Sequence, residues 1–152
     1  MLKKILKNEK GINLLEVLVA LALLGIIAVG FLSAISTAAK ASFLSERQAI
    51  AENLARSQLE NAKDQPYQAA ETPDSEVEYG AITEDYSNFS IWSVNRAGEV
   101  VEQIIGVPWD TAANTASTDD NDIQKIKIVI KHQDEEIYSL EGYKIDDSQT
   151  TE

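Results

Sequence analysis

Residues 10–32 read KGINLLEVLVALALLGIIAVGFL, and this stretch decides the fold. From Val17 to Leu32 it contains 16 residues without one polar side chain. The wider window from Ile12 to Ile35 has 24 residues, and a helix needs about 20 to cross a bilayer. We therefore expect a membrane-spanning helix. A cleaved secretory signal usually has a shorter apolar core, so the length of the run disfavours that alternative.

One acidic residue, Glu16, interrupts the start of this apolar segment. An ionised side chain at mid-bilayer depth costs about 2.5–3.5 kcal/mol, so an acid in a spanning helix is by default a functional hypothesis. The alternative is a chance acid near the interface, hydrated by lipid headgroups. Four lysines precede the run, at positions 3, 4, 7 and 10. The positive-inside rule then places the N-terminus in the cytoplasm and the remainder of the chain outside the membrane.

Helical periodicity continues beyond the apolar run. Residues 36–65 contain neither glycine nor proline, and Pro66 ends the pattern. One half of the helical wheel is apolar and the other polar, which predicts an amphipathic helix. The apolar half holds Phe43, Leu44, Ile50, Ala51, Leu54, Ala55, Leu59 and Ala62. We expect one continuous helix from about Ile12 to about Gln65, which offers this apolar face to a partner element.

The sequence after Pro66 favours β-structure. Residues 66–88 and the polar segment Asp110–Asp122 are expected to be loops. Between and after them, four β-rich runs are expected to form strands: Phe89–Val94, Val100–Val107, Ile123–Lys131 and Glu136–Ile145. In the third run Ile126, Ile128 and Ile130 would point one way and Lys125, Lys127, Val129 and Lys131 the other, and residues 132–135 suit a hairpin turn. The predicted fold class is α+β, with a three- or four-stranded antiparallel sheet laid against the apolar face of residues 43–62.

Composition excludes some classes of function. The formal net charge is −12, and because residues 1–11 hold four lysines and one glutamate, the rest of the chain carries −15. Such acidity argues against nucleic-acid binding, which depends on lysine and arginine. There is no cysteine, hence no thiol chemistry. No phosphate loop, zinc spacing or catalytic constellation is recognisable, so we expect no enzyme activity, no cofactor and no metal.

Gly11 before a long apolar helix, with an acid five residues later at Glu16, resembles the class III signal of type IV pilins and pseudopilins. The segment AENLARSQLE, residues 51–60, resembles the helix of minor pilins and minor pseudopilins. The long helix followed by a small antiparallel sheet is also similar to this family. Two features depart from it: isoleucine stands after the glycine where many relatives have phenylalanine, and the helix lacks a central proline.

The resemblance implies cleavage between Gly11 and Ile12 by a prepilin peptidase, and N-methylation of the new amine on Ile12. It implies four segments: a leader (1–11), a transmembrane and assembly helix (12–35), an amphipathic helix (36–65) and a β-rich head (66–152). Glu16 would then be the assembly residue. The expected partners are the peptidase, other pilin or pseudopilin subunits, the inner-membrane assembly platform and membrane lipid. The chain would be a single-pass protein of the cytoplasmic membrane, later an extracytoplasmic filament subunit.

Several alternatives remain open at this stage. The function is expected to be that of a minor pilin or pseudopilin, and the sequence does not choose among a type IV pilus, a type II secretion pseudopilus and a DNA-uptake filament. The rival is an uncleaved, signal-anchored extracytoplasmic binding module. For residues 119–122 a solvated acidic loop is favoured over a calcium site, since the spacing of an EF-hand is missing. His132 is expected at a surface turn, and Trp92 and Trp109 in the core rather than at an interface.

Overall fold

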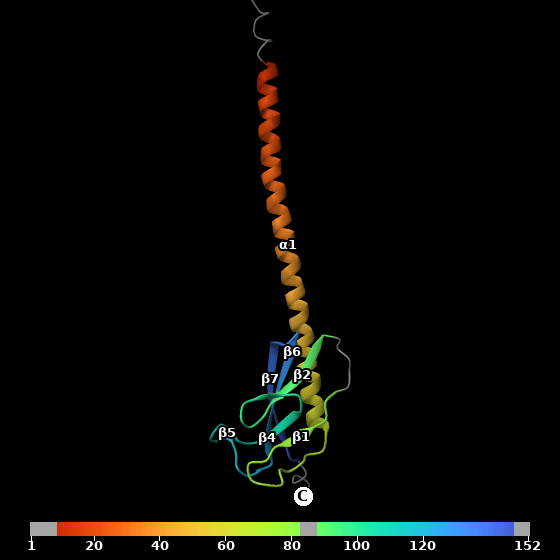
Figure 1. Cartoon of the computed structure of the whole chain (residues 1–152), viewed down its shortest axis with the longest axis vertical. Helices are drawn as coiled ribbons and strands as arrows, with labels where there is room; N and C mark the ends of the chain where they lie inside the picture. The colour runs from red at the N-terminus through yellow and green to blue at the C-terminus, as the bar shows by residue number, and fades with distance from the viewer. Residues whose placement is uncertain (1–8, 83–87, 148–152) are drawn as a thin grey trace, which may run out of the picture. The chain divides into compact units, whose positions relative to one another are not determined.

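The computed structural model describes residues 9–82 and 88–147, with side chains from Leu14 onward. Its described part is α+β, with one helix and seven strands, which confirms the predicted class (Figure 1). The elements are α1 Glu9–Asp64, β1 Val77–Tyr79, β2 Phe89–Val94, β3 Val100–Val101, β4 Ile104–Asp110, β5 Thr115–Ala116, β6 Ile123–His132 and β7 Glu135–Ile145. The chain divides into two compact units, residues 1–45 and residues 46–152. Each unit is described by itself below.

Helix α1 agrees with the predicted helix to within a few residues. It begins at Glu9 rather than Ile12 and ends at Asp64, two residues before Pro66. A proline disfavours helical geometry in the residue before it, which explains the end. The helix terminus also has a cap that the sequence does not reveal. The ammonium of Lys144 donates to the carbonyl oxygens of Ala62 at 2.8 Å, of Lys63 at 2.6 Å and of Gln65.

The sheet is antiparallel throughout and is built around β6. Strand β7 pairs with β6 along its whole length. The other edge of β6 is shared, because β4 pairs with its first half and β2 with its second half. Ser93 joins these two neighbours: its hydroxyl donates to the Gln103 carbonyl at 2.6 Å and accepts from the Ile105 amide at 2.9 Å. Strands β1 and β5 add to β4, and β3 adds to β2.

Several expectations about the strands were wrong. The described residues form seven strands instead of three or four, because the expected loop 66–88 contains β1 and the expected loop Asp110–Asp122 contains β5. The expected single strand Val100–Val107 is two strands, β3 and β4. Strands β1, β3 and β5 have three, two and two residues, too few to display a period of two in the sequence.

The hairpin between β6 and β7 was predicted correctly. Its two loop residues, Gln133 and Asp134, have φ angles of 53° and 67°. Two successive residues in the left-handed region form the turn whose twist matches that of the flanking strands. The register of the hairpin shifts between Ile130 and Lys131, where the strand is irregular.

The core of the second unit lies between α1 and one face of the sheet. Helix residues Ala51, Leu54 and Ala55 are 0–2 % exposed, and Ile126, Ile128 and Ile130 are fully buried. The alternation predicted for β6 is therefore confirmed. Helix and sheet lie close together at Gly142, where a Cβ atom would lie 2.6 Å from a methyl carbon of Leu59. Glycine at this position lets the leucine side chain lie directly on β7.

Side-chain amides of α1 and of Gln65, the residue after it, fix the chain just after β1. Gln58, Asn61 and Gln65 all donate to the carbonyl oxygen of Gly80, at 3.1, 2.9 and 3.0 Å. In return, the Gly80 amide donates to Gln65 and the Ile82 amide donates to Gln58, both at 2.8 Å. Gln58 is fully buried, so these bonds satisfy an amide group that burial would otherwise penalise. The short strand β1 is thereby held against the helix.

Candidate functional site

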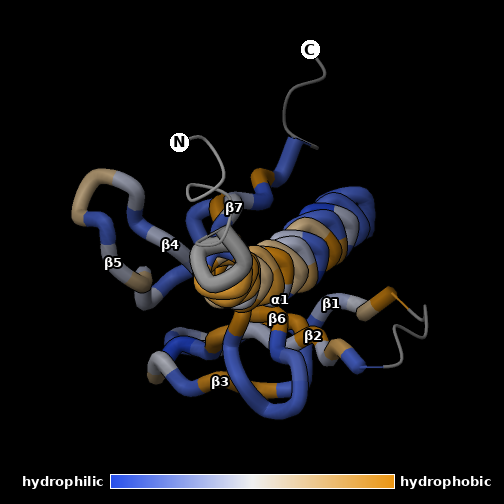
Figure 2. Tube along the Cα trace, turned by 90° about the horizontal axis from the view of Figure 1, so that it is seen from above, coloured by the Kyte–Doolittle hydropathy of each residue, from blue (hydrophilic) through white to orange (hydrophobic). Residues whose placement is uncertain are grey.

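The first part of α1 exposes its apolar side chains on all sides. Every large apolar residue from Leu14 to Leu44 is at least 47 % exposed. Figure 2 colours much of this part of the helix as hydrophobic. By length and composition the helix can cross a membrane, and a signal sequence near an N-terminus would satisfy the same criteria. An uncovered apolar surface of this extent is typical of a segment that inserts into a membrane or packs against other chains.

Glu16 is an exposed carboxylate on this apolar helix. Among the described residues it has no hydrogen-bond or ion-pair partner. Gly11 and Ile12 belong to the helical backbone of α1, and the side chain of Ile12 lies outside the described part. Residues 1–8 of the expected leader also lie outside it. Cleavage after Gly11, methylation of Ile12 and pairing by Glu16 therefore stay predictions.

The apolar face of the amphipathic segment is shorter than predicted. Phe43 and Leu44 are 64 % and 65 % exposed, whereas burial begins with Ile50 and Ala51. The predicted core face was therefore wrong at its first two members, and these extend the uncovered apolar surface of the first unit. Gly25 and Gly30 also lie on that surface, and apart from the neighbouring helix backbone no atom lies within 4 Å of a Cβ placed on either.

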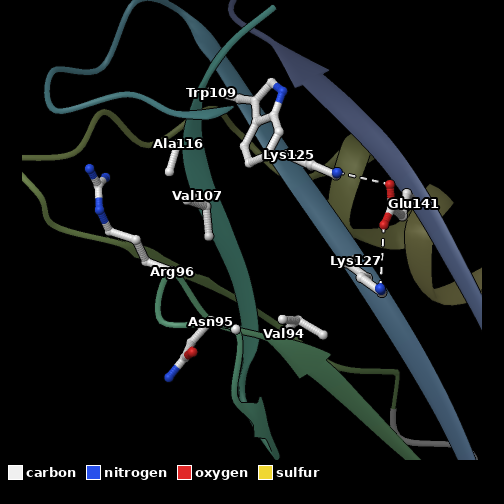
Figure 3. Close-up of a pocket in the computed structure, with 10 residues that line it drawn as sticks. Val94, Asn95, Arg96, Val107, Trp109, Ala116, Lys125, Lys127 and Glu141 are labelled. Carbon is white, nitrogen blue, oxygen red and sulfur yellow. Dashed lines mark ion pairs between the residues drawn. The ribbon is translucent and has the colours of Figure 1, made fainter. Parts of the chain in front are cut away.

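The sheet face opposite the core carries a second candidate site, here called the outer face. It is defined by Trp92, Val107, Trp109, Lys125, Lys127, Lys131 and Glu141. A pocket of about 270 Å³ opens on it (Figure 3). Val94, Val107, Trp109 and Ala116 give this pocket an apolar lining, and Arg96, Lys125, Lys127 and Glu141 supply charges. The pocket therefore combines an apolar surface with a predominantly positive set of charged groups.

Two lysines of β6 share one carboxylate of β7 in this pocket. Lys125 and Lys127 lie 2.8 Å and 3.4 Å from the two carboxylate oxygens of Glu141, as the dashed lines of Figure 3 mark. The hydrogen bond from Lys125 is the main cause that lowers the pKa of Glu141 below its ordinary value. The register explains the cluster, because Lys127 lies directly opposite Glu141 and side chains two residues apart share a face.

Each tryptophan of the chain lies under a lysine of β6. The Lys125 ammonium is 4.3 Å from the ring centre of Trp109, and that of Lys131 is 3.9 Å from the ring centre of Trp92. Both rings are partly buried on the outer face instead of belonging to the core between sheet and helix. The expectation of core tryptophans was therefore wrong. In both pairs the ammonium group itself lies over the aromatic ring, which is the geometry of a cation–π contact.

Arg96 occupies the turn between β2 and β3, at the other side of the pocket. Its guanidinium lies 2.5 Å from the Asp74 carboxylate and donates to the Ser117 carbonyl at 2.6 Å. The Arg96 backbone amide donates to Glu76. These bonds tie the turn to the segments before β1 and after β5, and fix the guanidinium beside the pocket.

In the acidic segment 119–122, Asp120 has a structural role, because its carboxylate accepts hydrogen bonds from other parts of the chain. The Asp120 carboxylate accepts from the Tyr67 hydroxyl, from the Ala70 amide at 2.8 Å and from the Gln124 side chain at 2.8 Å. Burial and this carboxylate together raise the pKa of Tyr67. In the described part of the chain, no three histidine, cysteine, aspartate or glutamate residues gather closely enough to hold a metal ion.

His132 is buried, contrary to the expected surface position. It is 9 % exposed, and its ring lies 4.8 Å from that of Phe89, the residue paired with it across the sheet. Neither ring nitrogen has a hydrogen-bond partner among the residues described. It is the last residue of β6 and continues the inward alternation of Ile126, Ile128 and Ile130, a signal that the sequence already contained.

No protein-family model, curated protein or solved structure matches the chain. The geometry nevertheless places it in a recognisable class of architecture. A long apolar N-terminal helix is followed by an antiparallel sheet that packs against the C-terminal part of that helix. The architecture is pilin-like. The helix is long enough to anchor the protein in a membrane.

Proposed function

We propose that the chain is a subunit of a type IV pilus or a type II secretion-like filament, as a minor pilin or a pseudopilin. One observation carries the proposal. A single helix, α1, has an exposed apolar first part with one carboxylate and a second part covered by a sheet. Such a helix can lie in the bilayer before assembly and against other helices afterwards, and both environments are apolar.

In this proposal a prepilin peptidase cuts between Gly11 and Ile12 on the cytoplasmic side, and the new amine on Ile12 is N-methylated. A positive amine in apolar surroundings needs an anionic partner. Glu16 of a neighbouring subunit supplies it, so that two unpaired charges are replaced by one ion pair. Removing one partner of a buried pair typically costs about 3–5 kcal/mol, enough to make Glu16 a determinant of axial register.

We further propose that the chain itself performs no catalysis and needs no cofactor. The chemistry and energy of assembly would come from its partners, which are the peptidase and the inner-membrane assembly platform. The other subunits and membrane lipid would contact the helix, and the acidic head would not bind nucleic acid. The protein would reside in the cytoplasmic membrane with its N-terminus inside, and then in an extracytoplasmic filament.

The second candidate is an uncleaved, signal-anchored binding module. The observation in its favour is the outer-face pocket, with apolar lining from Val107 and Trp109 and with positive groups around it. In that case α1 is only an anchor, and the spacing of Gly11 and Glu16 has no role.

The deciding experiment is the intact mass and N-terminal sequence of the full-length chain, expressed with and without an active prepilin peptidase. The filament-subunit proposal expects a chain that begins at Ile12 and carries an added methyl group only when the peptidase is present. A Gly11→Leu variant serves as the control that stays uncleaved. A wild-type chain that still begins at Met1 beside a peptidase shown to cleave another substrate would place the binding module first.

A further inference from the structure

We propose that the outer face of the sheet is a docking site for an acidic peptide segment of a different protein chain, in which a carboxylate neighbours an apolar side chain. The starting observation is the distribution of charge. After Lys63 the sequence has only five lysines and arginines, and four of them lie on or beside the outer face: Arg96, Lys125, Lys127 and Lys131. The fifth, Lys144, is buried at the end of α1.

The charges of this face are only partly balanced from within. Lys125 and Lys127 share Glu141, and Arg96 pairs with Asp74. Lys131 has no carboxylate within ion-pair distance among residues 14–82 and 88–147. Within ion-pair distance, the described residues thus offer these four cations two carboxylates. Each ammonium has three N–H donors and its pair with Glu141 uses one, so the pocket can bind a further carboxylate.

The apolar lining of the outer-face pocket indicates that the ligand has an apolar component. Val94, Val107, Trp109 and Ala116 contribute apolar surface to a pocket large enough for an aliphatic side chain. Tryptophan and arginine are the residue types that most often dominate binding energy at protein interfaces. Lys125 held over Trp109 and tied to Glu141 is already ordered, which reduces the entropy lost on binding.

The negative charge around the outer face favours a short acidic segment as the ligand over a long polyanion. The chain beyond Gly11 carries −15, so a nucleic acid or an anionic polysaccharide that extended beyond the four cations would meet carboxylates. The same charge disfavours a second copy, because two such chains repel each other as wholes. A local acidic segment on a different, less acidic protein gains the contacts without this repulsion.

The two tryptophans provide a specific readout. Trp92 and Trp109 are the only tryptophans of the sequence, and both lie on the outer face. The full-length protein in detergent micelles is titrated with an acetylated, amidated (Glu-Leu)4 peptide while tryptophan fluorescence is followed. Saturable binding that weakens with salt is expected. The matched (Gln-Leu)4 peptide and a heparin oligosaccharide are expected to bind at least about tenfold more weakly.

Two substitutions are expected to change the affinity for the (Glu-Leu)4 peptide in opposite directions. Lys127→Gln should weaken binding of the (Glu-Leu)4 peptide about three- to fivefold, the range of one partly exposed ion pair. Glu141→Gln should strengthen it by a similar factor, because it frees both lysines from their internal partner. Lys63→Gln, at an exposed helix position, is the control and should leave binding unchanged. Thermal unfolding of each variant verifies that the fold is kept.

Several outcomes overturn the proposal: equal binding of the (Glu-Leu)4 and (Gln-Leu)4 peptides, tighter binding of heparin, or the same affinity in Lys127→Gln and wild type. Concentration-dependent self-association that Lys127→Gln abolishes would also overturn it, because the occupant would then be a second copy. The outcome of the peptide-binding experiment does not depend on whether the chain is cleaved at its N-terminus. A chain cleaved at Gly11 that binds no acidic peptide retains the proposed function and loses only this inference.

Discussion

The ammonium of Lys144 lies 2.8 Å from the carbonyl oxygen of Ala62, a residue 82 positions earlier in the chain. Lys144 is 4 % exposed and also donates to the carbonyl groups of Lys63 and Gln65. The last carbonyl groups of a helix have no partner within the helix, and they carry the negative end of its dipole. A strand near the C-terminal end of the described chain therefore supplies the cap of the N-terminal helix, and sheet and helix stabilise each other.

The first prediction concerns this cap. Lys144→Met keeps most of the side-chain volume and removes the donors, which leaves buried carbonyl groups without a partner. We expect a loss of about 2–3 kcal/mol in the free energy of unfolding, measured by urea denaturation. Lys63→Met changes an exposed side chain in the last turn of the same helix and keeps the backbone carbonyl that Lys144 binds, so it should alter stability by about 0.5 kcal/mol or less. Equal stabilities of the two variants would refute the role of Lys144 as a cap.

The second prediction concerns alkaline pH. Tyr79 is 2 % exposed and donates to Gln124 at 2.6 Å, and burial raises its pKa to about 12. In the unfolded chain it titrates near its ordinary value of 10.0. Between these values the folded state holds a proton that the unfolded state releases, so stability falls as pH rises, by up to about 1.4 kcal/mol per pH unit.

Tyr79→Phe should reduce the loss of stability at rising pH. It should not abolish that loss, because the pKa of Tyr67 is also raised. Lys144 acts with the opposite sign, since burial lowers its pKa and its contribution rises with pH. The measurement is therefore the difference in unfolding free energy between wild type and Tyr79→Phe at pH 9 and pH 11. A difference that does not change between these pH values would contradict the buried, protonated phenol.

The third prediction tests the contact between Gly142 and Leu59. A Cβ atom at residue 142 would lie 2.6 Å from one methyl carbon of Leu59 and 2.9 Å from the other. Gly142→Ala should therefore destabilise the protein by about 1–3 kcal/mol through overpacking. In a Leu59→Ala background the same substitution should cost much less, because the leucine methyl groups are gone. A double-mutant cycle measures this coupling, and additive effects would show that the contact is not the cause.

The sequence predicted the elements whose pattern is long enough to have a period. Helix α1 and strands β2, β6 and β7 were predicted nearly to their ends. The inward alternation of Ile126, Ile128 and Ile130 was predicted too, and extending it by one step would have placed His132 inside. Strands of two or three residues, such as β5, form because a neighbouring strand offers hydrogen bonds, and this information is not local.

The outer face could be predicted only in part for the same reason. The alternation of Lys125 and Lys127 places them on one face of β6, and the sequence shows this directly. That Glu141 lies between them depends on the register of β7, and that Trp109 lies under Lys125 depends on the register of β4. Registers follow from packing of the whole sheet and its turns, so such a cluster becomes visible only in three dimensions.

The last prediction addresses Glu16, the residue on which the proposed assembly mechanism depends. Glu16→Ala and Glu16→Leu should insert into the membrane as wild type does, because both substitutions make the spanning segment more apolar. Their incorporation into filaments should fall sharply, since the amine of Ile12 on a neighbouring subunit would be left without its carboxylate partner. Membrane fractionation measures the first quantity, and the amount of subunit in sheared filament fractions measures the second. If Glu16→Leu were incorporated as efficiently as wild type, helix packing alone would drive assembly, and the carboxylate would have no role in setting the register of the subunits.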